Sequence, residues 1–200
     1  LHVTVPPYSK TEKVMATLET FRERLLEQYR KVEIRPIDFS YAIRTACFRL
    51  WLEPSPLKCF TLKQTGEGIC ICCPADIDFS CEQVQKLVRA AILRALKKSA
   101  GSYLPPLLEA LAERYGFSYR KVKITGARSR WGSCSAAGTI SLSCYLMLLP
   151  PHLMDYVLLH ELSHTKEMNH GPRFWELLDS LTEGKALSLR AELRNYRPAF

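Results

Sequence analysis

The stretch Thr139–Trp175 decides the fold and the chemistry of this chain, and it reads TISLSCYLMLLPPHLMDYVLLHELSHTKEMNHGPRFW. Its centre is an HExxH pattern, in which His160 and His164 are the histidines and Glu161 follows the first. Residues four apart lie on one face of a helix, with Cβ atoms about 5–6 Å apart. The two histidines can therefore share one Zn²⁺, each through a neutral imidazole nitrogen at roughly 2.0–2.1 Å. Glu161 projects beside the ion, where it can take a proton from a zinc-activated water as general base.

The pattern around these residues predicts a buried helix with a break directly after it. Pro150 and Pro151 favour a helix start, and residues 153–162 are apolar on nearly every side, which is typical of a buried helix. The run 169–172, Asn-His-Gly-Pro, ends the helical segment, so the chain can turn there and bring His170 back under the metal. Three protein ligands with one open position are typical of a catalytic zinc site.

Residues on both sides of this helix resemble a known family. They are RSRWGSCS at 128–135, the strand-like 139–144, and HELSH followed by a third histidine, glycine, phenylalanine and tryptophan within 160–175. Together they resemble the YgjP-like family, small bacterial metal-dependent hydrolases related to the SprT and WLM zincin-type peptidases. The resemblance is clearest over 120–176. Metzincins space their third histidine in the same way, but they carry a glycine where this chain has Glu167.

The resemblance implies a zincin-like core in which His160, His164 and His170 are the metal ligands and Glu161 is the base. In zincin-like folds an edge strand lies along the active-site cleft, where an extended peptide can add to the sheet. Arg130 and Trp131 lie in one of the strands expected for this sheet, residues 129–133, and Arg130 is a candidate contact residue. It could contact a substrate anion or form a salt bridge that fixes the strand, and both interpretations stay open.

The rest of the sequence predicts an α+β fold. Residues 32–80 alternate or run apolar in short segments between turns, which indicates three or four antiparallel strands in a β-rich lobe. A second, small antiparallel sheet packed on the active-site helix is predicted from three segments, 117–124, 129–133 and 139–144. We therefore expect an N-terminal helix and β-rich lobe over residues 1–80 and a zincin-like catalytic domain over residues 81–200, joined as one continuous structural unit.

Apolar spacing predicts helices elsewhere in the chain. One amphipathic helix is expected from Ser9 to about Tyr29. A second is expected over 81–99, where Gly101 ends it, and a third from Pro105 to about Tyr115. We expect the last two to pack behind the active-site helix.

Composition indicates a globular protein with a basic surface. Of the 200 residues, 47% are apolar and 24% charged, and the net charge is +8, which favours acidic partners such as nucleic acid, nucleotides or anionic surfaces. No apolar run approaches the ~18–20 residues that span a bilayer, so we expect no membrane association. The opening residues 1–7 show neither an initiator methionine nor a signal-peptide pattern, and we expect the first residues to be missing.

The cysteines indicate a reducing compartment. There are eight, but disulfide frameworks belong to short secreted chains with small cores. Most of these cysteines fall in apolar, strand-like runs, where a free cysteine behaves as a small hydrophobe. We expect a cytoplasmic protein with free thiols.

Three functions fit these observations. The first is a zinc metallopeptidase that cleaves peptides or proteins, with Arg130 and Trp131 near the substrate. The second is a metal-dependent nucleoside triphosphate (UTP) pyrophosphatase, in which the basic segment 120–130 would hold phosphates. The third is a DNA-associated protease or binding module. The complete HExxH pattern favours the first, since no phosphate-cradling glycine loop, carboxylate-rich Mg²⁺ site or nucleic-acid-binding motif occurs. The sequence leaves the oligomeric state open.

Overall fold

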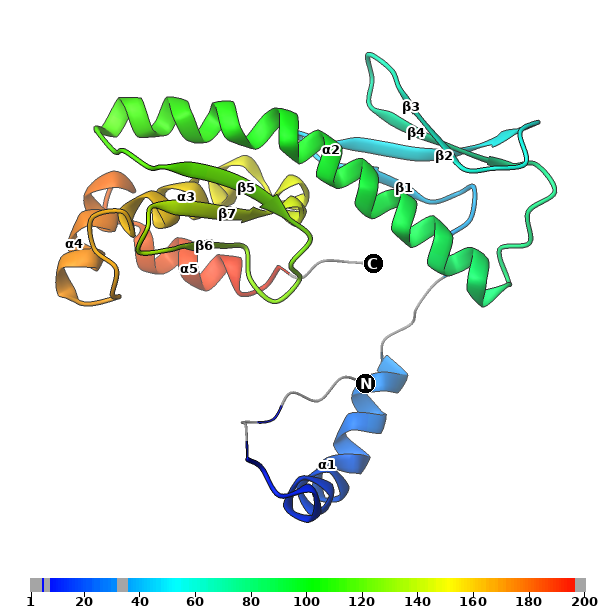
Figure 1. Cartoon of the computed structure of the whole chain (residues 1–200), viewed down its shortest axis with the longest axis horizontal. Helices are drawn as coiled ribbons and strands as arrows, with labels where there is room; N and C mark the ends of the chain where they lie inside the picture. Colours follow the sequence, from blue (N-terminus) through cyan, green and yellow to red (C-terminus); the bar gives the residue numbers. More distant parts are fainter. Residues whose placement is uncertain (1–4, 6–7, 32–35, 197–200) are drawn as a thin grey trace. The chain divides into compact units, whose positions relative to one another are not determined.

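The structure is a computed structural model, and it describes Val5, residues 8–31 and residues 36–196. Contacts within the chain divide it into two units, Leu1–Arg35 and Pro36–Phe200. The first unit contains α1 (Thr11–Lys31), close to the helix predicted at 9–29 (Figure 1). The boundary expected at residue 80 stays a prediction.

The second unit opens with a four-stranded sheet in the order β1-β2-β4-β3. Its strands are β1 (Ala42–Arg44), β2 (Arg49–Ser55), β3 (Thr61–Gln64) and β4 (Ile69–Pro74). The predicted β-rich lobe is therefore present, but the prediction of antiparallel strands was wrong, because β2 and β4 run parallel. The physical reason is burial. β4 carries the buried Ile69, Ile71 and Cys73 and takes a central place, while the partly exposed β3 pairs with its outer edge.

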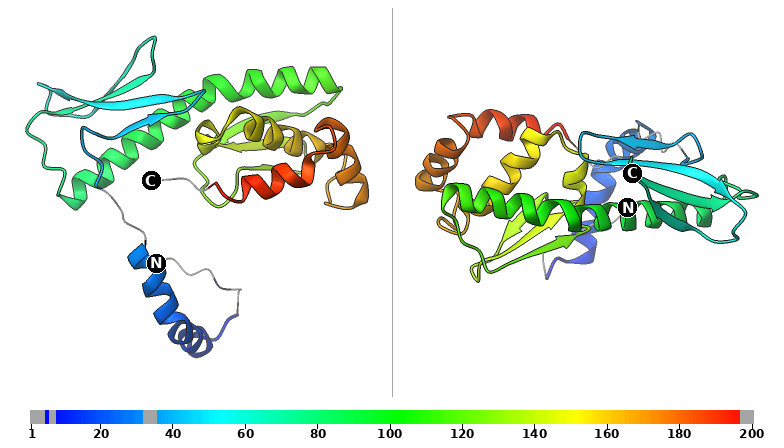
Figure 2. Two further views of the ribbon diagram at one scale, coloured as in Figure 1. Left: turned by 180° about the vertical axis from the view of Figure 1, so that it is seen from behind. Right: turned by 90° about the horizontal axis from the view of Figure 1, so that it is seen from above.

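A single long helix, α2 (Glu82–Tyr115), replaces the two helices predicted for this region. Its buried side chains form one continuous stripe: Val88, Ile92, Ala95, Leu96, Ala100, Leu104, Leu108 and Ala112. Packing of that stripe holds the helix together through Gly101, Pro105 and Pro106. The helix bends part-way along (Figure 1), as expected where prolines remove backbone hydrogen bonds. It runs past both sheets of this unit (Figure 2).

The second sheet has three strands in the order β5-β7-β6, with bounds β5 (Lys121–Thr125), β6 (Gly132–Cys134) and β7 (Thr139–Ser143). β6 and β7 form an antiparallel pair, as predicted for the segments 129–133 and 139–144. The all-antiparallel sheet was wrong, because β5 runs parallel to β7. β7 carries the fully buried Ile140 and Leu142 and lies in the centre. The connection between β5 and β6 carries the chain back, which leaves β6 at the edge.

The site-bearing part of the chain follows β7. A 3-10 helix, η1 (Cys144–Leu148), leads to α3 (Pro151–Ser163), and α4 (Pro172–Leu181) and α5 (Ala186–Leu193) complete the fold. Residues of α2, α3, α4 and both sheets share one apolar core. The architecture is α+β, with two small mixed sheets. Among the described residues, no helix has the length and apolar character to cross a bilayer.

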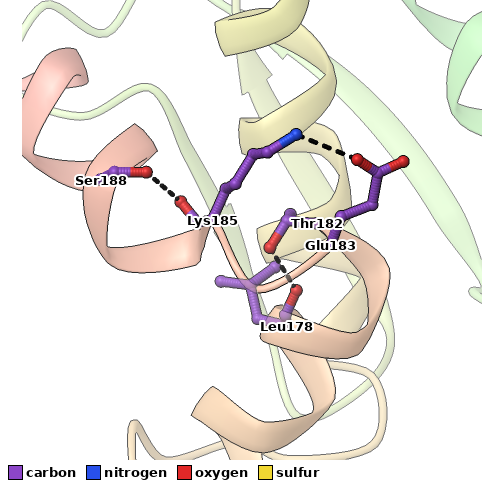
Figure 3. A network of polar contacts seen from close by, with 5 residues as sticks. All are labelled: Leu178, Thr182, Glu183, Lys185 and Ser188. Carbon is purple, nitrogen blue, oxygen red and sulfur yellow. Dashed lines mark hydrogen bonds and ion pairs between the residues drawn. The ribbon is translucent and has the colours of Figure 1, made fainter.

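A short turn fixes the direction of α5 after α4 (Figure 3). Thr182 Oγ1 donates a hydrogen bond to the carbonyl of Leu178 at 2.8 Å, and Ser188 Oγ donates to the carbonyl of Lys185 at 2.9 Å. Glu183 adopts φ 54° in the left-handed region, and its carboxylate pairs with Lys185 at 3.0 Å. These local bonds hold α5 at its place beside α3.

Candidate metal centre

Helix α3 carries the HExxH pattern on a rigid, buried element. Pro151 is its first residue, as the sequence predicted. Nine of its side chains are buried: Leu153, Met154, Tyr156, Val157, Leu158, Leu159, Glu161, Leu162 and Ser163. The apolar residues among them fix the helix in the core, and the backbone places His160 and His164 one turn apart.

The loop after α3 brings the third histidine to the other two. His164 ends the helix, and its Nδ1 lies 3.0 Å from the carbonyl of Glu167. Farther along, Trp175 Nε1 donates a hydrogen bond to the carbonyl of His170 at 3.2 Å. One ligand atom each of His160, His164 and His170 then lie within 4.8 Å of one another.

The Phe174 ring packs against the rings of all three histidines. This residue was not predicted as a site residue. Its side chain is fully buried, and its ring centroid lies 4.9 Å from that of His160, 4.6 Å from that of His164 and 4.7 Å from that of His170. The sequence signal was its position four residues after His170, at the start of α4.

Electrostatics favour neutral imidazoles in this cluster. Burial, followed by the neighbouring His164 and His170 and by Arg190, lowers the pKa of His160 to about 3. Burial also lowers the pKa of His170, with His164 and Arg190 adding to the effect. Both rings are therefore neutral at pH 7, which is the form that binds a metal ion. Burial raises the pKa of the Glu161 carboxyl to about 8, and the positive charge of a bound metal ion would lower it towards the ionised form that a base requires.

The residues fit a single divalent ion. Nε2 of His160 and Nε2 of His170 are 3.0 Å apart, so two ring nitrogens without protons can face a common point. Nitrogens that share one zinc ion at roughly 2.0–2.1 Å lie at most about 4 Å apart, so a cluster with a spread of up to 4.8 Å needs to contract by less than about 1 Å to hold it. Among the described residues, the buried Oε2 of Glu161 has no hydrogen-bond partner. A water bound to an ion at the three imidazoles would give this carboxylate oxygen its missing hydrogen-bond partner.

Strand β6 lies directly against the base. A Cβ atom added to Gly132 would come within 2.6 Å of Glu161 Oε1. Cys134, at the other end of β6, is half-buried; burial and then the Glu161 carboxylate raise the pKa of its thiol. Its Sγ donates to the carbonyl of Ser135 at 3.5 Å, and the thiol is not part of the histidine cluster.

The two residues predicted to lie near the substrate directly precede β6. Trp131 is half-buried, and its carbonyl accepts a hydrogen bond from the Ser143 amide at 2.8 Å. Arg130 is exposed and lines a cavity together with Arg128. Arg120, from the same basic segment, lines a different cavity of about 290 Å³ beside His164. Thr125, Ala127 and again Arg130 line a third cavity, so the segment 120–130 is divided among separate cavities.

Comparison with protein families identifies the group. The model of the YgjP-like metallopeptidase domain matches residues 1–196. The chain belongs to the YgjP-like family. Members share a metallopeptidase domain, so the family implies a divalent metal and a peptide or protein substrate. A search of curated proteins gave no match. The chain is also similar to a solved structure, the metallopeptidase zymogen of Pyrococcus abyssi abylysin, with 26% identity over 45% of this chain and 90% of that one, and a TM-score of 0.41.

Proposed function

We propose that the chain is a zinc metallopeptidase with a zincin-like core, in which His160, His164 and His170 hold one ion and Glu161 is the general base. The observation that carries the proposal is the convergence of three histidine ligand atoms within 4.8 Å, beside a buried glutamate. Membership of a metallopeptidase family supports the same reaction class. Three imidazoles leave room for water and substrate at a zinc ion.

Each residue of the site has a distinct task in this proposal. When bound, a zinc ion supplies Lewis acidity: it polarises a carbonyl oxygen and lowers the pKa of water. Glu161 accepts the proton of the attacking water at its carboxylate and passes it to the leaving amine. The contact between His164 Nδ1 and the Glu167 carbonyl fixes the ring orientation and leaves Nε2 for the ion. Phe174 keeps the three rings in place.

The peptide substrate would lie along β6. This strand is the edge of the sheet order β5-β7-β6, and its first residue touches Glu161. An extended peptide can add to such an edge through backbone hydrogen bonds, with alternate side chains directed into pockets. The cavity of about 290 Å³ beside His164 has room for one of those side chains.

Paired turnover assays test the proposal. Zinc-loaded wild type, Glu161→Gln and the matched control Glu113→Gln, an exposed carboxylate on α2, are incubated with casein and separately with UTP. We expect cleavage of casein by wild type and by the control, and none by Glu161→Gln. Glu161-dependent release of phosphate or pyrophosphate from UTP, without casein cleavage, would contradict the peptidase proposal and support the pyrophosphatase alternative.

A further inference from the structure

A basic cavity lies between the loop before β6 and the end of α5. It has a volume of about 530 Å³, and its charged lining residues are Arg128, Arg130 and Arg194. Trp131 and Tyr196 add aromatic walls. Ser129 and Leu193 complete the lining, and none of the described lining residues is acidic. We call it the arginine pocket.

The three guanidinium groups have no acidic partner within the described part of the second unit. Among residues 36–196 of the structure, none of them forms an ion pair with an acidic side chain. Glu192, the acidic residue closest in sequence to Arg194, is engaged with His152 Nε2 at 2.8 Å. Like charges gathered at one cavity repel each other, and a bound anion relieves that repulsion. The pocket is therefore arranged for an anionic group from outside the chain.

The chemistry of the lining fits a carboxylate on a peptide. Arginine binds carboxylates through two parallel N–H···O bonds, which are stronger than neutral hydrogen bonds. Arginine, tryptophan and tyrosine are also the residue types that dominate binding energy at protein interfaces. The cavity has the size of a site for one or two side chains, whereas a nucleic acid strand needs an extended basic groove with successive stacking platforms.

The arginine pocket continues the path of the peptide along β6. Arg130 and Trp131 directly precede Gly132, which lies against Glu161. A strand rises about 3.3 Å per residue, so the pocket begins about two residues beyond the base. Arg190, which is not a lining residue, lies one turn of α5 before Arg194, and its guanidinium is 5.0 Å from the ring centroid of Trp175. The loop before β6 and the end of α5 meet at this pocket.

We propose that the arginine pocket binds an acidic side chain of the peptide substrate, about two to four residues from the cleaved bond. This inference rests on the proposed function, because it takes the peptide along β6 past Glu161. It names the substrate class: peptides or unfolded segments that carry aspartate or glutamate at a fixed distance from the cleavage site.

Binding in an inactive chain tests the pocket without requiring turnover. The probe is a short fluorescein-labelled peptide with a run of glutamates, and its control has glutamines in their place. Binding to Glu161→Gln is followed by fluorescence anisotropy at low and high salt. We expect the glutamate peptide to bind at least about tenfold more tightly than the glutamine peptide. Adding Arg194→Ala should remove that difference.

Matched variants separate the pocket from general charge effects. Arg94→Ala removes an exposed arginine of α2 and should leave the preference unchanged. Arg128→Ala is a second pocket variant, and thermal melting of each variant checks the fold. Equal affinity for both peptides, or equal effects of Arg194→Ala and Arg94→Ala, would overturn the pocket. If oligothymidylate binds more tightly than the glutamate peptide, and Arg194→Ala abolishes that binding, the ligand of the pocket would be a single-stranded nucleic acid and not a peptide.

Cleavage-site profiling with a mixture of unstructured peptides then tests whether the pocket influences where the chain cuts. Zinc-loaded wild type should cut with acidic residues enriched at one position two to four residues from the bond, and Arg194→Ala should lose that enrichment while still cutting. Cleavage without any acidic preference would overturn the pocket alone. Arg194-dependent binding by a chain that cuts nothing would support the pocket and contradict the peptidase.

Discussion

Gly132 and Glu161 are in direct contact across the interface between β6 and α3. A Cβ atom at position 132 would lie 2.6 Å from Oε1, 2.7 Å from Cγ and 2.8 Å from Cδ of the glutamate. Glu161 is only 5% exposed, so its carboxylate has little space into which it can move. The Glu161 carboxylate can therefore occupy this position only because Gly132 has no side chain.

We expect Gly132→Ala to displace the Glu161 carboxylate and to lower turnover by about 100-fold, since a displacement of about 1 Å costs that much in positioned catalysis. Zinc content should stay unchanged. The matched control is Gly126→Ala, whose added Cβ would meet Lys97 Cε, the end of an exposed side chain that can move away. Steady-state peptide cleavage and metal analysis of both variants check this. Wild-type turnover in Gly132→Ala would remove the positioning role.

Replacing any ligand histidine should abolish zinc-dependent stabilisation. Zinc at 100 times its dissociation constant stabilises a folded chain by about 2.7 kcal/mol, which raises the Tm of a chain of this size by about 5–10 °C. His160→Ala, His164→Ala and His170→Ala should lose that shift. His152→Ala should keep it, because His152 is exposed and pairs with Glu192. Differential scanning fluorimetry with zinc and after chelation gives the comparison.

Phe174 should contribute to zinc affinity, although it is not itself a ligand. Phe174→Leu keeps most of the buried volume and should cost about 1 kcal/mol of unfolding free energy. The loosened rings should weaken zinc binding about tenfold. Phe48→Leu, a buried phenylalanine just before β2, serves as the control, with a similar loss of stability and unchanged zinc affinity. Competition with a chromogenic chelator measures the zinc affinity of both variants. Equal zinc affinity in the two variants would contradict the role given to Phe174.

The cysteines should differ widely in reactivity. Burial raises the pKa of Cys70 to about 12 and those of Cys73 and Cys144 to about 11. At pH 8 only about one in a thousand of the latter two is a thiolate, the reactive form. Cys59 and Cys81 are exposed and should react first with iodoacetamide. Peptide mass spectrometry of the native chain, with an unfolded sample as reference, follows the order. Uniform labelling would show that the core is open.

The sequence predicted the local features of this fold better than the long-range ones. The positions of His160 and His164 follow from helical spacing alone, and the return of His170 follows from the break at 169–172. The parallel pairs β2–β4 and β5–β7 were missed, because pairing between distant strands is set by which strand is most buried in the assembled core. The continuity of α2 through Gly101 was missed for the same reason. The catalytic and ligand roles of the site residues stay predictions.

One titration tests the central claim most directly. Chelated wild type and Glu161→Gln receive zinc in small steps while bound metal and peptide cleavage are measured in the same samples. We predict that wild-type cleavage rises with zinc and stops rising at about one ion per chain, as expected for a three-histidine site. Glu161→Gln should bind the same amount of zinc without cleaving. Cleavage that does not depend on zinc, or that persists in Glu161→Gln, would contradict the assignment of this site.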